Sequence, residues 1–183
     1  MFGPVLEGRR VTLRPPRESD LPRFVEWLSD REVTRFLGQG ARAFALVQEE
    51  EWHKRVGESK DDVVWAIAIE DDRTIGVIGI HRIDWIHAHA ITGILIGDKK
   101  EWRKGYATEA MALRTDYAFA QLNLHKLSTQ VFMDNEASRH ALRRSGYRQI
   151  GTQREELWQG GRWHDAWLAE VLRADWERAK ASR

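Results

Sequence analysis

Short runs of apolar and β-branched residues recur along the chain, and residues that favour turns separate them. Val11–Arg14 alternates between apolar and polar positions and ends at Pro15-Pro16. Six longer runs have the length and residue content of strands. In chain order they are Val63–Ile69, Thr74–Ile83, Ile91–Ile96, Lys126–Phe132, Tyr147–Trp158 and Arg162–Leu172. Ile91–Ile96 is almost wholly apolar, as expected of a buried central strand.

Helical spacing of apolar residues predicts helices between these strands. One begins at Ser19 or Asp20, and one or two more occupy residues 31–60. A long helix covers 105–122, and a short one begins at Asn135. Within residues 31–60 we expect a buried set made of Phe44, Val47, Trp52 and Val56, and a solvated acidic face made of Glu49, Glu50 and Glu51.

The order of these elements predicts a mixed α/β (α+β) fold, in which helices flank both faces of a largely antiparallel sheet. With 183 residues the chain is long enough for one substantial core, and no change in composition divides it. We therefore expect a single domain over residues 1–183. Residues 173–183 are charged and are expected to form a C-terminal tail, either a solvated helix or a frayed end.

The composition excludes several classes of partner. Lys and Arg number 29 against 28 Asp and Glu, which leaves a formal net charge of +1, so we expect no nucleic-acid partner. The absence of cysteine excludes disulfides, a thiol nucleophile and a thiolate zinc site. No stretch approaches the apolar length of a membrane span or of a signal peptide, so we expect no membrane partner and a cytoplasmic location.

The stretch between the strand Ile91–Ile96 and the long helix carries the strongest chemical signal. It includes Trp102–Ala107, with the sequence Trp-Arg-Lys-Gly-Tyr-Ala. Free backbone N–H groups at a helix start point outward, and the helix dipole adds positive potential there. Gly105 would let a phosphate approach closely, and Arg103 and Lys104 would add charge, so the turn is predicted to bind an anion. Its spacing fits neither a Walker loop nor a dinucleotide fingerprint.

Gly105-Tyr106-Ala107 resembles the second half of the acyl-CoA loop, Q/R-x-x-G-x-G/A, of the GNAT superfamily of acyl-CoA N-acyltransferases. The longer string IGDKKEWRKGYATEA is similar to the RimJ/RimL type, the ribosomal-protein alanine N-acetyltransferases. Asp134–Gly151 resembles the N-x-x-S…G-[FY] segment of the same branch. The resemblance covers roughly Leu6–Leu172 and implies the GNAT fold, in which two neighbouring strands splay apart and the pantetheine arm of CoA lies between them.

The resemblance implies acetyl-CoA as a cosubstrate. The pyrophosphate would bind backbone N–H groups of the turn, and the acetyl end would lie beside the central strand. Asn135 would bind the pantetheine arm, a role compatible with the plain helix N-cap that is its alternative. The expected cofactor-binding residues are Ile94, Leu95, Ile96, Arg103, Lys104, Gly105, Tyr106, Ala107, Thr108 and Asn135.

Two departures from the family pattern concern proton transfer. Leu142 stands where many GNAT enzymes have a tyrosine that protonates the leaving thiolate, and Ile91 and Thr92 are nearest to the usual glutamate base. The RimL-like branch resembles this chain in offering a serine one turn earlier, here Ser138. We hypothesise that Ser138 donates that proton; the alternative is a first-turn serine that bonds to the helix backbone.

Asp84 and His81 are candidates for the general base, together with His87 and His89; an imidazole titrates in the useful range. The alternative for each histidine is a surface or packing role. His87 and His89 alternate along a strand, but no third ligand accompanies them at a telling spacing, so we expect no metal site. Most tryptophans are expected in the core, although Trp85 and Trp158 could line an acceptor pocket.

The sequence thus predicts an N-acetyltransferase that moves an acetyl group from acetyl-CoA to a primary amine by direct attack in a ternary complex. The expected acceptor is a small-molecule amine or the α-amine of a protein or peptide; an α-amine, with a pKa near about 8, needs little help from a base. The alternative is a non-catalytic acyl-CoA-binding or sensing domain, because the tyrosine and glutamate are missing. Sheet edges and the terminal hairpin favour a homodimer.

Overall fold

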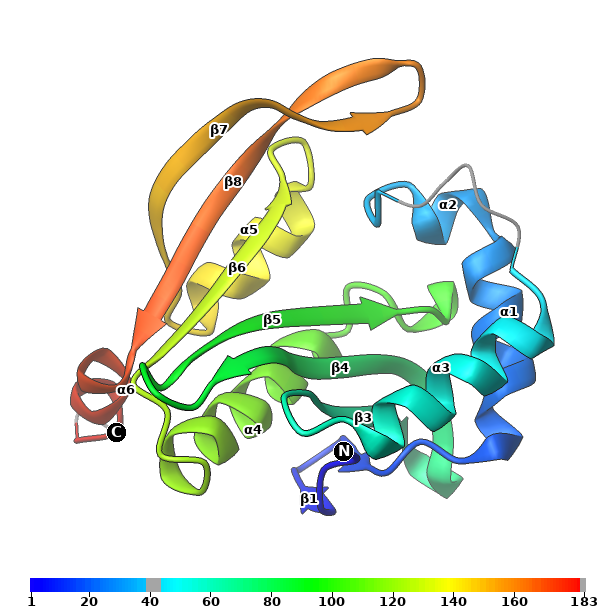
Figure 1. Ribbon diagram of the computed structural model, residues 1–183, viewed down its shortest axis with the longest axis horizontal. Helices are drawn as coiled ribbons and strands as arrows, with labels where there is room; N and C mark the ends of the chain where they lie inside the picture. Colours follow the sequence, from blue (N-terminus) through cyan, green and yellow to red (C-terminus); the bar gives the residue numbers. More distant parts are fainter. Residues whose placement is uncertain (39–43, 182–183) are drawn as a thin grey trace.

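A single sheet organises the computed structural model, which describes residues 1–38 and 44–181 (Figure 1). Its strands are β1 (Leu6–Glu7), β2 (Thr12–Arg14), β3 (Val63–Ile69), β4 (Arg73–Asp84), β5 (His89–Ile96), β6 (Lys126–Phe132), β7 (Arg148–Gln159) and β8 (Arg162–Leu172). Their spatial order within the described residues is β1-β2-β3-β4-β5-β6-β8-β7. Among the paired strands of the described residues, only β5 and β6 run parallel, so the predicted, largely antiparallel sheet is confirmed.

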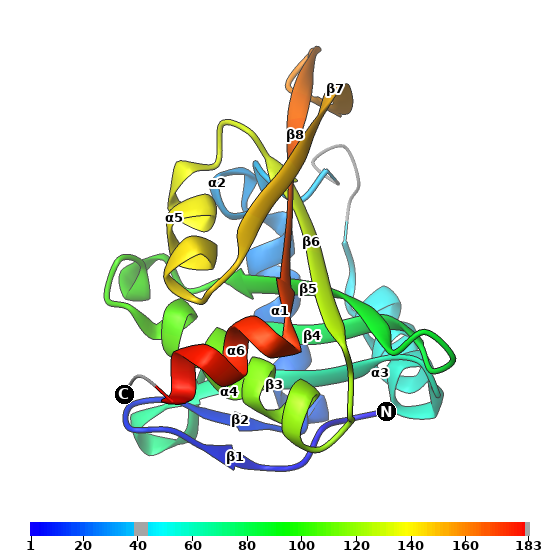
Figure 2. The same cartoon turned by 90° about the vertical axis from the view of Figure 1, so that its left-hand side faces the viewer.

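Helices cover both faces of this sheet. They are α1 (Leu21–Ser29), α2 (Arg31–Thr34), α3 (Leu46–Glu58), α4 (Tyr106–Ala120), α5 (Glu136–Arg144) and α6 (Arg173–Ala181), with short 3-10 turns at Glu18–Asp20, Glu70–Asp72 and Lys99–Glu101. Figures 1 and 2 show α1 and α3 on one side of the sheet and α4 and α5 on the other. Among the described residues, no helix has the length and apolar content that a membrane crossing requires.

The alternation of side chains along β4 and β5 divides the core into two layers. Ile78, Ile80 and Ile94 belong to the larger cluster, which α4 covers. Val77 and Leu95 point the opposite way and pack against a smaller cluster built around Phe24 and Trp27 of α1. Residues of β4 and β5 that alternate with the isoleucines therefore face α1 and α3.

A buried ion pair joins the 3-10 turn before α1 to strands β2 and β4 of the sheet. The guanidinium of Arg14 in β2 donates to both carboxylate oxygens of Asp20, at 2.8 and 3.0 Å. Arg14 and Asp20 both bond to the hydroxyl of Thr74 in β4. Burial acts to raise the pKa of the Asp20 carboxyl, but the bonds from Arg14, Thr74 and the Arg17 N–H outweigh it and lower that pKa.

The structure corrects the predicted orientation of α3. Val47, expected to be buried, is 51% exposed, whereas Glu49, expected on a solvated face, is only 6% exposed. The helix starts at Leu46 and turns Glu49 and Val56 toward the protein, seven residues apart on one face. Which face of α3 is buried could not be predicted, because a charged residue, Glu49, lies on that face.

Of the two alternatives expected for residues 173–183, the helix is present within the described residues, and the structure adds an attachment to the core. Arg173–Ala181 forms α6, which Trp176 attaches to the core by contacting Phe119 of α4 with ring centroids 5.6 Å apart. The Trp176 indole N–H donates to Asp116 on the same helix, α4. A single aromatic residue in a charged stretch thus packs α6 against the larger core cluster. The end of the predicted tail, 182–183, lies outside the described residues.

Candidate active site

The parallel strands β5 and β6 part along their length. Within the part of the chain that the structure describes, they pair only at His89–Ile91 and Lys126–Ser128. Beyond this point β5 continues along β4 and β6 continues along β8, and Figure 1 shows the two strands diverging. The Thr129 hydroxyl donates to the Thr92 carbonyl at 3.1 Å, which ties the strands together at the point where pairing ends. The splay expected of the fold is therefore present.

Backbone groups of β5 face this splay. The carbonyls of Ala90 and Thr92 accept hydrogen bonds from the hydroxyls of Ser128 and Thr129 in β6, at 3.2 and 3.1 Å. Because backbone direction alternates along a strand, the N–H and C=O of Ile94 point to the same side. Ile94 thus offers a donor and an acceptor beyond the last pair of β5 with β6. At the next equivalent position, Ile96, the carbonyl accepts from the Trp102 indole at 2.8 Å.

The predicted anion-binding turn leads into α4. Gly105 is the residue before the helix and has φ +87°, a conformation that glycine adopts without strain. No side chain of the described residues caps the helix, so its first N–H groups lack a capping partner there. Arg103 also has a positive φ, +63°. A glycine turn followed by open N–H groups is the arrangement that binds phosphate at helix starts.

The cations of the turn differ in how far they are neutralised. Lys104 bonds to Glu101 at 2.8 Å, and Glu101 also accepts from Arg73. Hydrogen bonds from Lys104 and Arg73 hold the pKa of the Glu101 carboxyl below its usual range. Arg103 has no ion pair within the described part of the chain. Arg103 is therefore the freer cation, and Lys104 has an internal partner.

Arg10 secures the turn from the β1–β2 connection, a role that the sequence did not reveal. Its Nη1 donates to the Lys104 carbonyl at 3.0 Å, and its Nε pairs with Glu109 at 3.1 Å. Its guanidinium lies over the Tyr106 ring, 5.1 Å from the centroid. Tyr106 and Glu109 thus hold Arg10, while their neighbours in the first turn of the helix keep open N–H groups.

Two predicted residues lie at the start of α5, which follows β6. Asn135 is the N-cap, and its side-chain oxygen accepts the Ser138 N–H at 3.1 Å. The plain N-cap role of Asn135 is therefore present, and its amide N–H₂ has no partner within the described residues. The Ser138 hydroxyl likewise makes no hydrogen bond there, so the backbone-bonded alternative for Ser138 is not observed. Leu142 is buried in the core.

His81 lies on the face of the sheet that α1 and α3 cover, over a pair of glycines. Gly79 in β4 and Gly93 in β5 are directly opposite each other. A Cβ added to Gly79 would lie 2.4 Å from His81 Nε2, and one added to Gly93 would lie 3.7 Å from it. The absence of side chains at both positions gives the imidazole its place beside β5.

Asp62 orients this imidazole. Its Oδ1 lies 3.3 Å from His81 Nδ1 and also accepts the Arg82 N–H, and its Oδ2 accepts the Ser59 hydroxyl. An ionised carboxylate can only accept, so the ring proton belongs on Nδ1 and the lone pair on Nε2. Asp62 is a further functional candidate; in the sequence it reads as part of the polar turn Lys60-Asp61-Asp62.

Local electrostatics favour a neutral His81 beside a charged Asp62. Burial lowers the pKa of His81, Asp62 opposes that effect, and Arg114 adds to it. Burial acts to raise the pKa of the Asp62 carboxyl, but hydrogen bonds from Ser59, the Arg82 N–H and His81 hold it below its usual range. An imidazole that is neutral at neutral pH can accept a proton.

The other base candidates, Asp84, His87 and His89, lie near the connection from β4 to β5, at the end where β5 still pairs with β6. Asp84 accepts the N–H groups of Ile86 and His87 and contacts His87 Nδ1 at 2.8 Å, so it caps the connection to β5. These bonds, led by the His87 N–H, lower the pKa of the Asp84 carboxyl. His87 and His89 have ring centroids 6.1 Å apart. Among the described residues, no group of three or more His, Asp or Glu could hold a metal ion.

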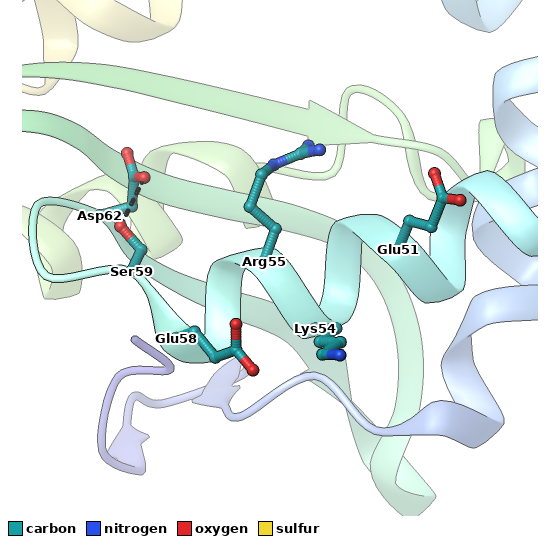
Figure 3. Close-up of a pocket in the computed structure, with 6 residues that line it drawn as sticks. All are labelled: Glu51, Lys54, Arg55, Glu58, Ser59 and Asp62. Atoms are coloured by element: carbon teal, nitrogen blue, oxygen red, sulfur yellow. Dashed lines mark hydrogen bonds between the residues drawn. The ribbon is translucent and has the colours of Figure 1, made fainter.

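A shallow cavity of about 350 Å³ lies along α3 and ends at Asp62 (Figure 3). Its lining residues are Glu51, Lys54, Arg55, Glu58, Ser59 and Asp62. Figure 3 shows Arg55 extending from α3 on the side where Asp62 lies, with Lys54 pointing away from it. Because Asp62 also bonds to His81, the cavity leads from the surface of α3 to the partner of the imidazole.

The aromatic acceptor pocket suggested for Trp85 and Trp158 is not assembled. Trp85 is on the connection from β4 to β5, where its indole N–H donates to Asp61 at 3.0 Å. Trp158 is near the turn between β7 and β8 and contacts Trp163. All three tryptophans are exposed, which corrects the expectation that they pack in the core, whereas Trp65 and Trp167 are buried.

Comparison with known proteins agrees with this geometry. The model of the acetyltransferase (GNAT) domain matches residues 10–148. The chain is 29% identical over 176 residues to YoaA, an uncharacterized N-acetyltransferase of Bacillus subtilis, a match that covers 93% of this chain and 97% of that protein. It is 31% identical over 110 residues to YdaF, a putative ribosomal N-acetyltransferase of the same organism, which covers 60% of each.

The fold also matches a solved structure. The crystal structure of spermidine N-acetyltransferase from Vibrio cholerae in complex with CoA and spermine superimposes with a TM-score of 0.85. The match covers 93% of this chain and 99% of that one at 22% sequence identity, and it shows the shared fold. Since the family model spans most of the chain, this protein belongs to the GNAT acetyltransferase family.

Proposed function

We propose that the protein transfers an acetyl group from acetyl-CoA to a primary amine, by direct attack of the amine in a ternary complex. The observation that carries the proposal is the splay of β5 from β6 next to an uncapped helix start at Gly105. Together they offer donors for a diphosphate and for a thioester in neighbouring positions. Membership of the GNAT family supports the same chemistry.

The residues present suit acetyl-CoA. The N–H groups from Arg103 to Thr108 suit its pyrophosphate, and the free amide of Asn135 suits the pantetheine arm. The backbone of Ile94 would bond to the acyl end, beside Leu95 and Ile96 on the same strand. When bound, acetyl-CoA supplies a thioester, whose C–S bond breaks as the C–N bond of the amide forms. The amine loses one proton, and the sulfur leaves with the electron pair of the broken bond.

His81 is the proposed acceptor of the amine proton. Its Nε2 carries the lone pair, because Asp62 fixes the proton on Nδ1. The proposed donor to the leaving sulfur is Ser138, whose hydroxyl has no other partner in the described residues. Asp84 is not assigned a role, because it caps a turn at the closed end of β4 and β5.

The acceptor is proposed to be a small-molecule amine or the α-amine of a peptide. The spermine in the structure of the Vibrio cholerae relative supports a small amine, and the partial similarity to YdaF supports a RimJ/RimL-like peptide acceptor. The cavity that ends at Asp62 has both carboxylates and cations on its wall, which suits an acceptor with charged groups of either sign.

A free-thiol assay tests the proposal. The purified protein is given acetyl-CoA with N-terminal peptides, polyamines, aminoglycosides or amino acids, and mass spectrometry checks the acetylated product. Transfer predicts release of CoA that depends on one class of amine and saturates with it. Binding of acetyl-CoA without release for any amine supports the alternative, a non-catalytic acyl-CoA-binding or sensing domain, and contradicts this proposal.

The expected homodimer stays part of the proposal. The β7–β8 hairpin forms one edge of the sheet and exposes Trp158 and Trp163, whose rings make an edge-to-face contact near its turn, with centroids 5.2 Å apart. Exposed aromatic residues on a sheet edge are typical of an interface between subunits. Light scattering of the wild type and of Trp158→Ser/Trp163→Ser decides the point, and a monomeric wild type contradicts it.

A further inference from the structure

Arg114 of α4 is buried beneath β5 with only 1% of its surface exposed. Its Nη1 donates to the Gly93 carbonyl at 3.3 Å, and its Nη2 donates to the Tyr147 hydroxyl at 3.0 Å. Its Nε has no hydrogen-bond partner in the described part of the chain. The guanidinium is therefore held in place while one of its donors stays unsatisfied.

No carboxylate within the described residues pairs with this cation. The titratable groups that face it are Tyr147, which follows α5, and His81, which lies across the sheet. Burial lowers the pKa of the Arg114 guanidinium, but arginine retains its charge in proteins. An uncompensated buried charge strongly destabilises a folded protein. A functional use would account for its presence.

The location of Arg114 suggests that use. The Tyr147 hydroxyl that it contacts lies 3.0 Å from the hydroxyl of Thr92, which in turn donates to the Ser128 carbonyl. This chain of hydrogen bonds crosses from α4 to β5 and β6 at the point where the two strands stop pairing. The charge therefore lies beneath the splay, next to the residues proposed to receive the thioester.

We propose that Arg114 takes part in the transfer reaction through its uncompensated charge. This charge stabilises the sulfur anion that leaves when the thioester C–S bond breaks. The inference rests on the proposed function, which brings acetyl-CoA into the splay. The electron pair of the broken bond goes to sulfur, where the positive potential of Arg114 is felt in a medium of low dielectric. The same potential opposes a protonated amine and a protonated His81 and so favours the reactive forms of both.

Binding of CoA itself tests this role without turnover. The affinities of CoA and desulfo-CoA, which lacks the sulfur, are measured by calorimetry between pH 6 and 9. A free thiol has a pKa of about 8.5. Each unit by which binding lowers the pKa of the CoA thiol means that the thiolate binds about tenfold more tightly than the thiol. In the wild type, we expect the affinity for CoA, relative to that for desulfo-CoA, to rise by at least about tenfold as pH rises from 6 to 9. Arg114→Met should abolish most of that gain and bind desulfo-CoA normally.

Three further variants separate charge from structure. Arg114→Lys retains the charge and should retain most of the gain, and Tyr147→Phe retains the arginine and should lose less of the gain than Arg114→Met. Arg178→Gln removes an exposed guanidinium of α6 and should match the wild type. Arg114→Met should lower kcat by about tenfold or more with little change in the KM for acetyl-CoA, and its thermal stability should equal or exceed that of the wild type.

The inference is overturned if wild-type CoA and desulfo-CoA show the same pH dependence, or if Arg114→Met retains the gain. Should Arg114→Met fail to fold, the wild-type comparison and Arg114→Lys still decide. Suppose that the wild type lowers the pKa of the bound thiol, but that none of the amines tested causes release of CoA from acetyl-CoA. This result contradicts the proposed function alone. A wild type that transfers acetyl groups without that lowering contradicts the inference alone, and one that does not bind CoA contradicts both.

Discussion

His81 and Arg114 lie on opposite faces of the sheet at one residue, Gly93. His81 Nε2 would lie 3.7 Å from a Cβ on Gly93, and Arg114 Nη1 lies 3.3 Å from the Gly93 carbonyl. The proposed base therefore lies on one face of β5 and the cation on the other. Gly93, the residue between them, has no side chain. Gly93 is also beyond the last residue of β5 that pairs with β6.

The glycine pair under His81 gives a prediction with its own control. A Cβ on Gly79 would lie 2.4 Å from His81 Nε2, so Gly79→Ala must displace the imidazole. A Cβ on Gly93 would make ordinary contact at 3.7 Å. We expect Gly79→Ala to lower kcat by about tenfold or more, and Gly93→Ala to lower it much less. Steady-state kinetics of the two variants measures this, and equal losses would show that the imidazole position is unimportant.

The protonation state of His81 predicts the acid limb of the pH profile. Burial lowers its pKa, so the limb in kcat/KM should lie below about 6.5, and activity should be lost only as pH falls through it. His81→Gln should lower kcat/KM by about 10²–10⁴-fold and remove the limb. Asp62→Asn removes an effect that raises the pKa, so the limb should move further down. An unchanged profile in His81→Gln rules out this base.

Ser138 and Ser145 are both serines of the α5 region with different bonding. The Ser138 hydroxyl is free of partners in the described residues, whereas the Ser145 hydroxyl donates to the Ala141 carbonyl at 2.9 Å. If Ser138 protonates the leaving sulfur, Ser138→Ala should lower turnover at saturating acceptor by about tenfold or more. Ser145→Ala should leave turnover close to that of the wild type. Unchanged turnover in Ser138→Ala removes the role.

The buried pair of Arg14 and Asp20 predicts how stability depends on pH. Since the pKa of Asp20 is lower in the folded state, its contribution is full above the unfolded value and is lost as pH falls through the folded one. Asp20→Asn removes the buried partner of Arg14 and leaves it only the pair with the half-exposed Asp72 at 2.6 Å, so the variant should lose at most about 3–5 kcal/mol at neutral pH. The acid loss of stability should be smaller in this variant.

Urea unfolding at pH 7 and at pH 3 measures both effects. Asp30→Asn, which breaks an exposed pair with Lys99, serves as the control and should change stability little. A loss in Asp20→Asn no greater than that in the control would show that the pair between the turn before α1 and β2 does not stabilise the fold.

The sequence was sufficient to predict the strands from β2 to β8 and most helices, because alternation along β4 or β6 and the turn at Gly105 are local patterns, whereas the two residues of β1 carry no such pattern. The same locality explains the errors. Glu49 is charged and Val47 apolar, yet the rotation of α3 is set by what it packs against, so the two were predicted the wrong way round. Trp176 likewise attaches the charged tail only because Phe119 is beside it.

The candidate site was predictable where it depends on backbone and hidden where it depends on tertiary contacts. Gly105 and Asn135 could be identified because a glycine before a helix and an N-cap are visible in sequence. Asp62 lies in a polar turn and meets His81 only through the pairing of β3 with β4. Arg114 reads as an ordinary charged residue of α4, and only the folded sheet shows that its charge is buried.

Hydrogen–deuterium exchange of the protein with and without CoA tests the central claim most directly, namely that the turn before α4 holds the diphosphate of CoA. We predict that CoA slows exchange of the amides from Arg103 to Thr108 and of Ile94 in β5, because these N–H groups would donate to the ligand. Exchange that is unchanged at this turn, or protection confined to another part of the fold, would contradict the claim.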